Sequence, residues 1–120
     1  MENIDDSETL LIHPSTYILA LENGKYYVGN TTNLTQRLSQ HFHNNGGSCW
    51  TSRHKPISVH QVIFPSCAHN ELLYFLAYAE HYGINSVRGS YWTKEKVFID
   101  PVYSNKYKEE VEKASKLDIY

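Results

Sequence analysis

The stretch from Thr16 to Phe42, TYILALENGKYYVGNTTNLTQRLSQHF, decides the fold. It opens with a β-branched and apolar run, Thr16 to Leu21, and a second such run, Lys25 to Gly29, follows the Asn23-Gly24 dipeptide. Asn-Gly readily adopts the positive φ angles of a tight turn, so these runs predict a β-hairpin. Apolar side chains then recur at 34, 38 and 42, behind a Thr-Thr-Asn cluster that can cap a helix. This spacing predicts a helix with one apolar face.

The rest of the chain extends this pattern to a small α/β domain. Residues 48–56 predict a basic loop that holds a tryptophan, and the alternation from Ile57 to Phe64 predicts a third strand. Glu71 to Tyr82 predicts a second helix, which Gly83 would end. We therefore predict a small sandwich in which a three-stranded antiparallel sheet is flanked by helices.

The domain boundaries follow from the same reading. Residues 1–14 are expected to form a flexible acidic tail, and 15–120 a single domain whose core spans about 15–90. A final helix is predicted over about 104–117, and a short strand near Lys96 to Ile99.

The composition excludes several classes of protein. Apolar residues make up 41% and charged residues 20% of the 120 residues, as in globular proteins. No apolar run approaches the length of a membrane span and the acidic start is unlike a signal peptide, so we expect an intracellular protein of the cytoplasm or nucleus. Two cysteines are too few for a disulfide framework. A zinc site built from Cys49, His54, Cys67 and His69 would match no compact ligand spacing, which argues against zinc.

The charge is segregated along the chain. Between Asn23 and Asn70 there is no Asp or Glu, but there are four Lys or Arg and five His, whereas the first 22 residues carry five acids and no Lys or Arg. A positive middle flanked by acidic ends suits a protein with one face toward phosphates. Four basic residues in this span could equally be an ordinary solvated surface.

Four polar side chains form the candidate catalytic group. The hairpin would bring Tyr17 and Tyr27 side by side, and Arg37 and His41 are four residues apart on one face of the first helix. Taken singly, these residues could be half-buried strand tyrosines and a solvated helix face. Their combined spacing favours a shared site.

Several motifs in this region resemble the GIY-YIG nucleases over roughly residues 15–90. The motifs that carry this resemblance are Tyr17-Ile18-Leu19, Tyr27-Val28-Gly29, Asn33-Leu34 and Arg37-Leu38-x-x-His41. Two further stretches, Gly47-Ser48-x-Trp50-Thr51 and Tyr82-Gly83-Ile84, look like a sub-branch of small stand-alone members. The first motif lacks its glycine, since Ser15 or Thr16 stands there.

The resemblance implies hydrolysis of DNA phosphodiester bonds with one divalent ion, Mg²⁺ or Mn²⁺. Tyr17 would deprotonate or position the attacking water, helped by Tyr27 and His41, and Arg37 would hold the scissile phosphate. A phenol with a pKa near 10 is a poor base, so a neighbour would have to lower it. Duplex, nicked or branched DNA would be the substrate.

The resemblance also implies a metal-binding glutamate on the later helix. Framed by Tyr82-Gly83, its expected position is occupied by Ala77, and alanine offers no oxygen to a hard cation. Three explanations are open, namely an engineered Glu→Ala change, a natural non-cutting relative, or substitution by Glu80 one turn later. The first is favoured because the other catalytic positions are kept. Glu71 is interpreted as stabilising the first turn of its helix.

Candidate DNA contacts are the basic, amide and aromatic side chains of the positive middle and the stretch after the second helix. They are Lys25, Asn33, Trp50, Arg53, His54, Lys55 and Arg88. Trp50 could stack on a base or simply pack its loop.

Three functions remain open at this point. The first is a structure-directed or loosely specific DNA endonuclease, inactive in this form because of Ala77. The others are a non-catalytic DNA- or RNA-binding module on the same fold, and a protein-interaction domain.

Overall fold

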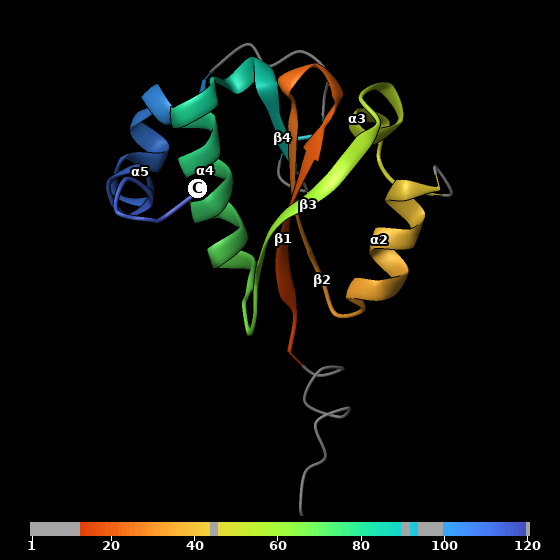
Figure 1. Ribbon diagram of the computed structural model, residues 1–120. Helices are drawn as coiled ribbons and strands as arrows, with labels where there is room; N and C mark the ends of the chain where they lie inside the picture. Colours follow the sequence, from red (N-terminus) through yellow and green to blue (C-terminus); the bar gives the residue numbers. More distant parts are fainter. Residues whose placement is uncertain (1–12, 44–45, 90–91, 94–99, 120) are drawn as a thin grey trace, which may run out of the picture.

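A four-stranded mixed sheet lies between two helical layers in the computed structural model, which describes residues 13–43, 46–89, 92–93 and 100–119. The strand order is β3-β1-β2-β4 (Figure 1). The strands are β1 Ser15–Leu21, β2 Tyr26–Thr31, β3 Pro56–Ile63 and β4 Val87–Gly89. The helices are α2 Leu34–Phe42, α3 Cys49–Arg53, α4 Ala68–Tyr82 and α5 Lys108–Ala114.

The predicted hairpin forms β1 and β2. A short 3₁₀ turn, Glu22–Gly24, joins them, and Asn23 and Gly24 both take the left-handed conformation with φ of 64° and 68°. The turn sets the antiparallel register, in which Tyr17 lies opposite Gly29 and Leu19 opposite Tyr27.

The sheet has one strand more than predicted, so the expectation of a three-stranded antiparallel sheet was wrong in this detail. β4 pairs in parallel with the first half of β2. Its three residues are too few to show a pattern in the sequence. The pairing depends on Gly89, because a Cβ there would overlap the main-chain oxygen of Val28.

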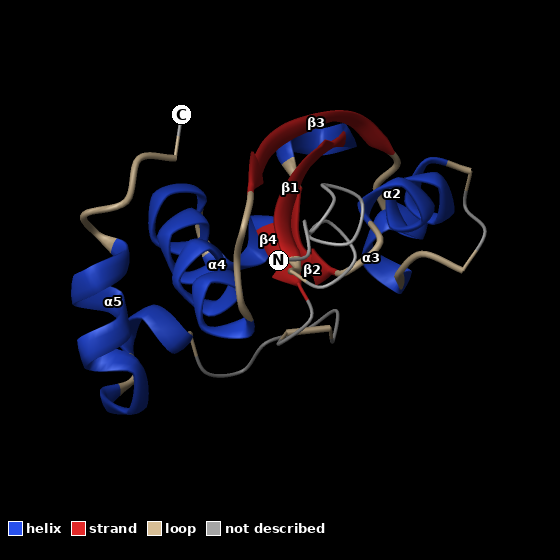
Figure 2. Cartoon of the chain, turned by 90° about the horizontal axis from the view of Figure 1, so that it is seen from below, coloured by secondary structure: helices blue, strands red, loops and turns tan. Residues whose placement is uncertain are grey.

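Alternate residues of the strands face different helical layers, as the period of a strand requires. Tyr17, Leu19 and Tyr27 pack with Trp50 on the side covered by α2 and α3. Ile18 and Val28 pack on the other side, against α4. Figure 2 shows the two layers on opposite sides of the sheet, with α5 outside α4.

The helix boundaries differ from prediction at three places. α4 begins at Ala68 rather than Glu71. The final helix is shorter than expected because two 3₁₀ turns, Pro101–Tyr103 and Asn105–Tyr107, precede α5. The predicted basic loop contains α3, whose capping box is closed by Ser48 and Thr51.

Two other expectations fall on residues outside the described ranges, namely the acidic tail up to residue 12 and the strand near Lys96 to Ile99. None of the helices in the described part of the chain is both long and apolar enough to cross a membrane.

Candidate active site

The centre of the site is the phenol of Tyr17, which β1 directs across the neighbouring strand. The ring lies directly over Gly29, so a Cβ at position 29 would come within 2.9 Å of Tyr17 Cε1 and overlap Cζ and Oη. Glycine at this position of β2 is therefore a steric requirement of the buried tyrosine.

An imidazole from α2 completes a buried aromatic trio. The Oη atom of Tyr17 lies 2.9 Å from Nε2 of His41. The ring centroid of His41 is 4.8 Å from that of Tyr27 and 5.7 Å from that of Tyr17. Both His41 and Tyr17 are only 1% exposed. The spacing in the sequence thus correctly predicted that these three side chains would meet.

The other nitrogen of His41 faces α3. Nδ1 lies 3.0 Å from Oγ1 of Thr51. Thr51 is held in turn by Ser48, whose main-chain N–H and carbonyl oxygen lie 3.1 and 3.2 Å from the same hydroxyl. Gly47 allows this close approach, since a Cβ there would lie 3.0 Å from Nδ1.

Arg37 lies one turn before His41 at the edge of the buried face. Its Nη1 donates to Gln40 Oε1 at 2.9 Å and to the main-chain oxygen of Gly46 at 3.0 Å. Burial disfavours the guanidinium charge, but Tyr17 and Tyr27 more than offset this effect, so the pKa of Arg37 lies above its usual value. The guanidinium therefore interacts with both phenols while remaining partly accessible.

The electrostatics keep Tyr17 and His41 neutral near pH 7. Burial, followed by the influence of Tyr27, raises the pKa of Tyr17 well above 10, and the nearby charge of Arg37 reverses only part of this rise. Burial and Arg37 together lower the pKa of His41 to about 4. The pKa of Tyr17 is therefore not lowered below its usual value, contrary to the expectation from the sequence. His41 is neutral because its own pKa is low, so it is available as a proton acceptor.

A carboxylate approaches the site from the opposite layer. Glu71, in the first turn of α4, is 3% exposed. Its negative charge is close enough to raise the pKa of Tyr17. Sequence reasoning assigned this residue to helix stabilisation. Burial of an acid in a first turn gives no signal of its own in the sequence.

The structure places Ala77 elsewhere. It is six residues after Glu71 and packs with Ala114 of α5. Together with the exposed Glu80 it lines a cavity of about 330 Å³ between α4 and α5. Neither position 77 nor Glu80 is brought to the tyrosine–histidine cluster.

Two of the predicted DNA contacts are buried in the core. Trp50 is 6% exposed, and its Nε1 donates to the main-chain oxygen of Tyr26 at 3.0 Å. Arg88 is 1% exposed, with its guanidinium 4.7 Å from the centre of the Trp50 ring and hydrogen-bonded to the main-chain oxygens of Ile84 and Val87. This arrangement stabilises the packing of α3 on the sheet, so stacking of Trp50 on a base is not supported.

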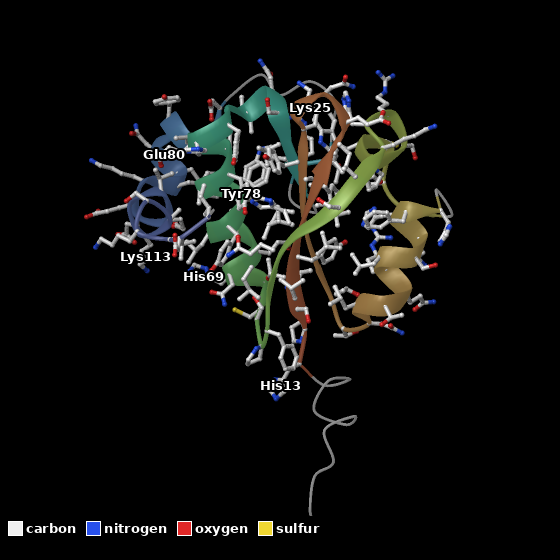
Figure 3. All side chains as sticks on the ribbon, in the orientation of Figure 1. His13, Lys25, His69, Tyr78, Glu80 and Lys113 are labelled. Atoms are coloured by element: carbon white, nitrogen blue, oxygen red, sulfur yellow. The ribbon has the colours of Figure 1, made fainter. Side chains whose placement is uncertain are left out.

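The remaining predicted contacts lie at or near the surface. Asn33 caps α2, accepting from the main-chain N–H of Gln36. Lys25 lies at the hairpin end of the sheet, and His13 lies at the other end (Figure 3). The Nζ atom of Lys25 donates to the main-chain oxygen of Asn85. The exposed basic residues Arg53 and Lys55, and the partly exposed His54, lie at and just after the end of α3.

The carboxylate of Glu71 is the acidic group whose charge acts on Tyr17. Within the described residues no group of three His, Cys, Asp or Glu side chains could hold a metal ion, and Cys49 and Cys67 are both exposed thiols.

Comparison with known families identifies the class of protein that this fold and site define. Residues 13–108 match the GIY-YIG catalytic domain, so the chain belongs to the GIY-YIG nuclease superfamily. Neither the curated proteins nor the solved structures gave a match to the chain.

Proposed function

We propose that this chain is a divalent-metal-dependent DNA endonuclease that is active as it stands, with Glu71 as its metal-binding carboxylate. The observation that carries this proposal is that Arg37 and Glu71 both act electrostatically on Tyr17, whose phenol contacts His41. One cation and one carboxylate thus act on the same buried phenol. A phosphate and a hard cation need these two charges on either side of the reacting oxygen.

The donors present fit a hard divalent ion. Mg²⁺ is usually held by one or two carboxylates and completes its shell with water and substrate phosphate oxygens. Glu71 supplies the carboxylate. Asn30 Oδ1 is a buried oxygen with no hydrogen-bond partner among the described residues. Asn30 follows Val28 by two residues and faces the same layer, where Val28 packs with Phe75, one turn after Glu71. When bound, the ion would neutralise charge on the phosphate oxygens.

The side chains of the protein account for the proton transfer. The attacking water would give its proton to Tyr17 Oη as Tyr17 passes its own proton to Nε2 of His41. This exchange avoids a free phenolate, which the raised pKa of Tyr17 disfavours. Arg37 would hold the phosphate, since a planar guanidinium donates to two of its oxygens.

Loosely specific or structure-directed recognition fits the accessible cations. Arg53 and Lys55 are exposed. Contacts to phosphate position DNA without reading bases.

The test is nicking of supercoiled plasmid and of branched duplex DNA with Mg²⁺, with Mn²⁺ and with chelator. Glu71→Gln should abolish metal-dependent nicking, because the amide cannot neutralise the cation. The matched change Glu80→Gln on the same helix should leave nicking intact. Mn²⁺ titration by electron paramagnetic resonance should show tight binding lost only in Glu71→Gln.

The alternatives predict different results. If Ala77→Glu nicks DNA and the unchanged protein does not, the metal-binding carboxylate belongs at position 77. No nicking by any form, with DNA binding that still weakens steeply with salt, would identify a non-catalytic binding module. Absence of both activities would favour a protein-interaction domain.

A further inference from the structure

Thr51 contacts the side of His41 that faces away from Tyr17, and the proposed proton transfer does not use it. It is 3% exposed and lies in α3, a five-residue helix. Its hydroxyl lies 3.0 Å from Nδ1 of His41. A buried hydroxyl against the second nitrogen of an imidazole can decide which nitrogen carries the proton.

The hydrogen bonds around Thr51 determine the direction of that contact. The hydroxyl proton of Thr51 has acceptors other than His41, because the carbonyl oxygen of Ser48 lies 3.2 Å away and Ser48 Oγ lies 3.0 Å away. The Oγ1 atom then acts as an acceptor, from the main-chain N–H of Ser48 at 3.1 Å and from His41 at 3.0 Å. In this arrangement Nδ1 of His41 carries the proton.

The reverse arrangement leaves a buried proton without an acceptor. If Thr51 donated to Nδ1, Nε2 would carry the proton and donate to Tyr17. The hydroxyl proton of Tyr17 would then have no acceptor among the hydrogen bonds recorded for the described residues, because Nε2 of His41 is the group recorded beside Tyr17 Oη that could accept it. An unsatisfied buried hydroxyl costs about 1–3 kcal/mol.

We propose that Thr51 is a positioning residue that holds His41 as the Nδ1–H tautomer, leaving the lone pair of Nε2 directed at the phenol of Tyr17. The tautomer follows from the hydrogen bonds alone, whereas its catalytic consequence rests on the proposed function. Gly47 leaves room for this contact, because a Cβ there would lie 3.0 Å from Nδ1 and 3.1 Å from Thr51 Oγ1. Thr51, which helps to cap α3, thus also orients the imidazole of His41.

The tautomer can be measured without any activity. Long-range ¹H–¹⁵N correlation spectra at pH 7, with His41 assigned by comparison with His41→Gln, distinguish a protonated Nδ1 from a protonated Nε2. The expected result is Nδ1–H in the unchanged protein and in Thr51→Ser, which keeps the hydroxyl. Thr51→Val keeps the shape but removes the acceptor, and should shift His41 toward the Nε2–H tautomer.

Activity provides the second measurement. Thr51→Val should lower kcat for nicking by about 10- to 100-fold with little change in KM, the usual effect of losing such an orienting contact. Thr51→Ser should restore most of the rate. Ser48→Ala is the matched control, because it removes the capping hydroxyl and its 3.0 Å contact with Thr51 Oγ1 but keeps the main-chain partners of Thr51 and the Thr51–His41 contact, and it should keep both the tautomer and most of the rate.

The outcomes separate this inference from the proposed function. Nε2–H in the unchanged protein, or Nδ1–H retained in Thr51→Val, would overturn the role of Thr51. A Ser48→Ala variant as slow as Thr51→Val would reduce that role to helix stability and overturn it as well. The expected tautomers in a protein that nicks no DNA would uphold the inference while refuting the nuclease assignment.

Discussion

Replacing Gly29 by alanine tests whether the Tyr17 ring must lie where the structure has it. The added methyl carbon would come within 2.9 Å of Cε1 and overlap Cζ and Oη. Carbon atoms pack best about 3.5–4.0 Å apart, so the ring must retreat by about 1 Å. Overpacking of this kind costs about 1–3 kcal/mol, and the better strand propensity of alanine offsets about 0.5–1 kcal/mol. We therefore expect a net loss of about 1–2 kcal/mol in the free energy of unfolding.

The effect on activity should be larger than the effect on stability. A shift of about 1 Å in a reacting group costs about 100-fold in rate, and it would also disturb the 2.9 Å contact between Tyr17 and His41. Urea unfolding followed by tryptophan fluorescence and plasmid nicking under conditions where Gly29→Ala stays folded measure the two effects separately.

A double-mutant cycle makes the test specific to the ring. Tyr17→Leu removes all three atoms that the methyl group would meet, so Gly29→Ala should cost less than about 0.5 kcal/mol in that background. An equal loss of stability in both backgrounds would show that the ring is not the reason for glycine at this position.

Three further outcomes can be checked. The pKa of His41 is lowered from 6.5 to about 4, so the contribution of neutral His41 to the free energy of unfolding is present above pH 6.5 and is lost as the pH falls through 4. We expect this loss to be about 2 kcal/mol after allowance for screening. It should shrink in His41→Gln when urea midpoints are compared across that pH range. Ala77→Glu should lower the free energy of unfolding by roughly 2 kcal/mol without tightening Mn²⁺ binding, because a carboxylate would be forced against Ala114. Arg53→Ala should lower the slope of log binding constant against log salt by about 1, whereas Arg88→Met should leave that slope unchanged and reduce stability, since its guanidinium is buried.

The sequence carried enough information for the hairpin and for most of the buried cluster. Asn23-Gly24 dictates a local turn, and a turn fixes the register of the two strands that follow from it. Arg37 and His41 share a helix face because of their spacing alone. These features are local, and each follows from residues close together in the chain.

The parts that were missed depend on contacts distant in the sequence. Trp50 and Arg88 look like surface residues of a basic region, yet they meet in the core because β4 adds to the edge of β2. Glu71 looks like a solvated first-turn acid, and its burial is decided by where α4 crosses the sheet. The expectation of a ligand at position 77 depends on counting back from Tyr82. Ala77 lies six residues after Glu71 on the helix, so its side chain points away from the sheet and toward α5.

The sheet divides the proposed centre between two layers, with the guanidinium on α2 and the carboxylate on α4. α4 is braced from outside by α5, across a contact that includes two alanines and an adjoining cavity. Weakening the contact between α4 and α5 would let Glu71 change position while Arg37 stayed in place. Under the proposed function, damage to the C-terminal helix would therefore first appear as a higher metal concentration needed for nicking, while DNA binding is retained.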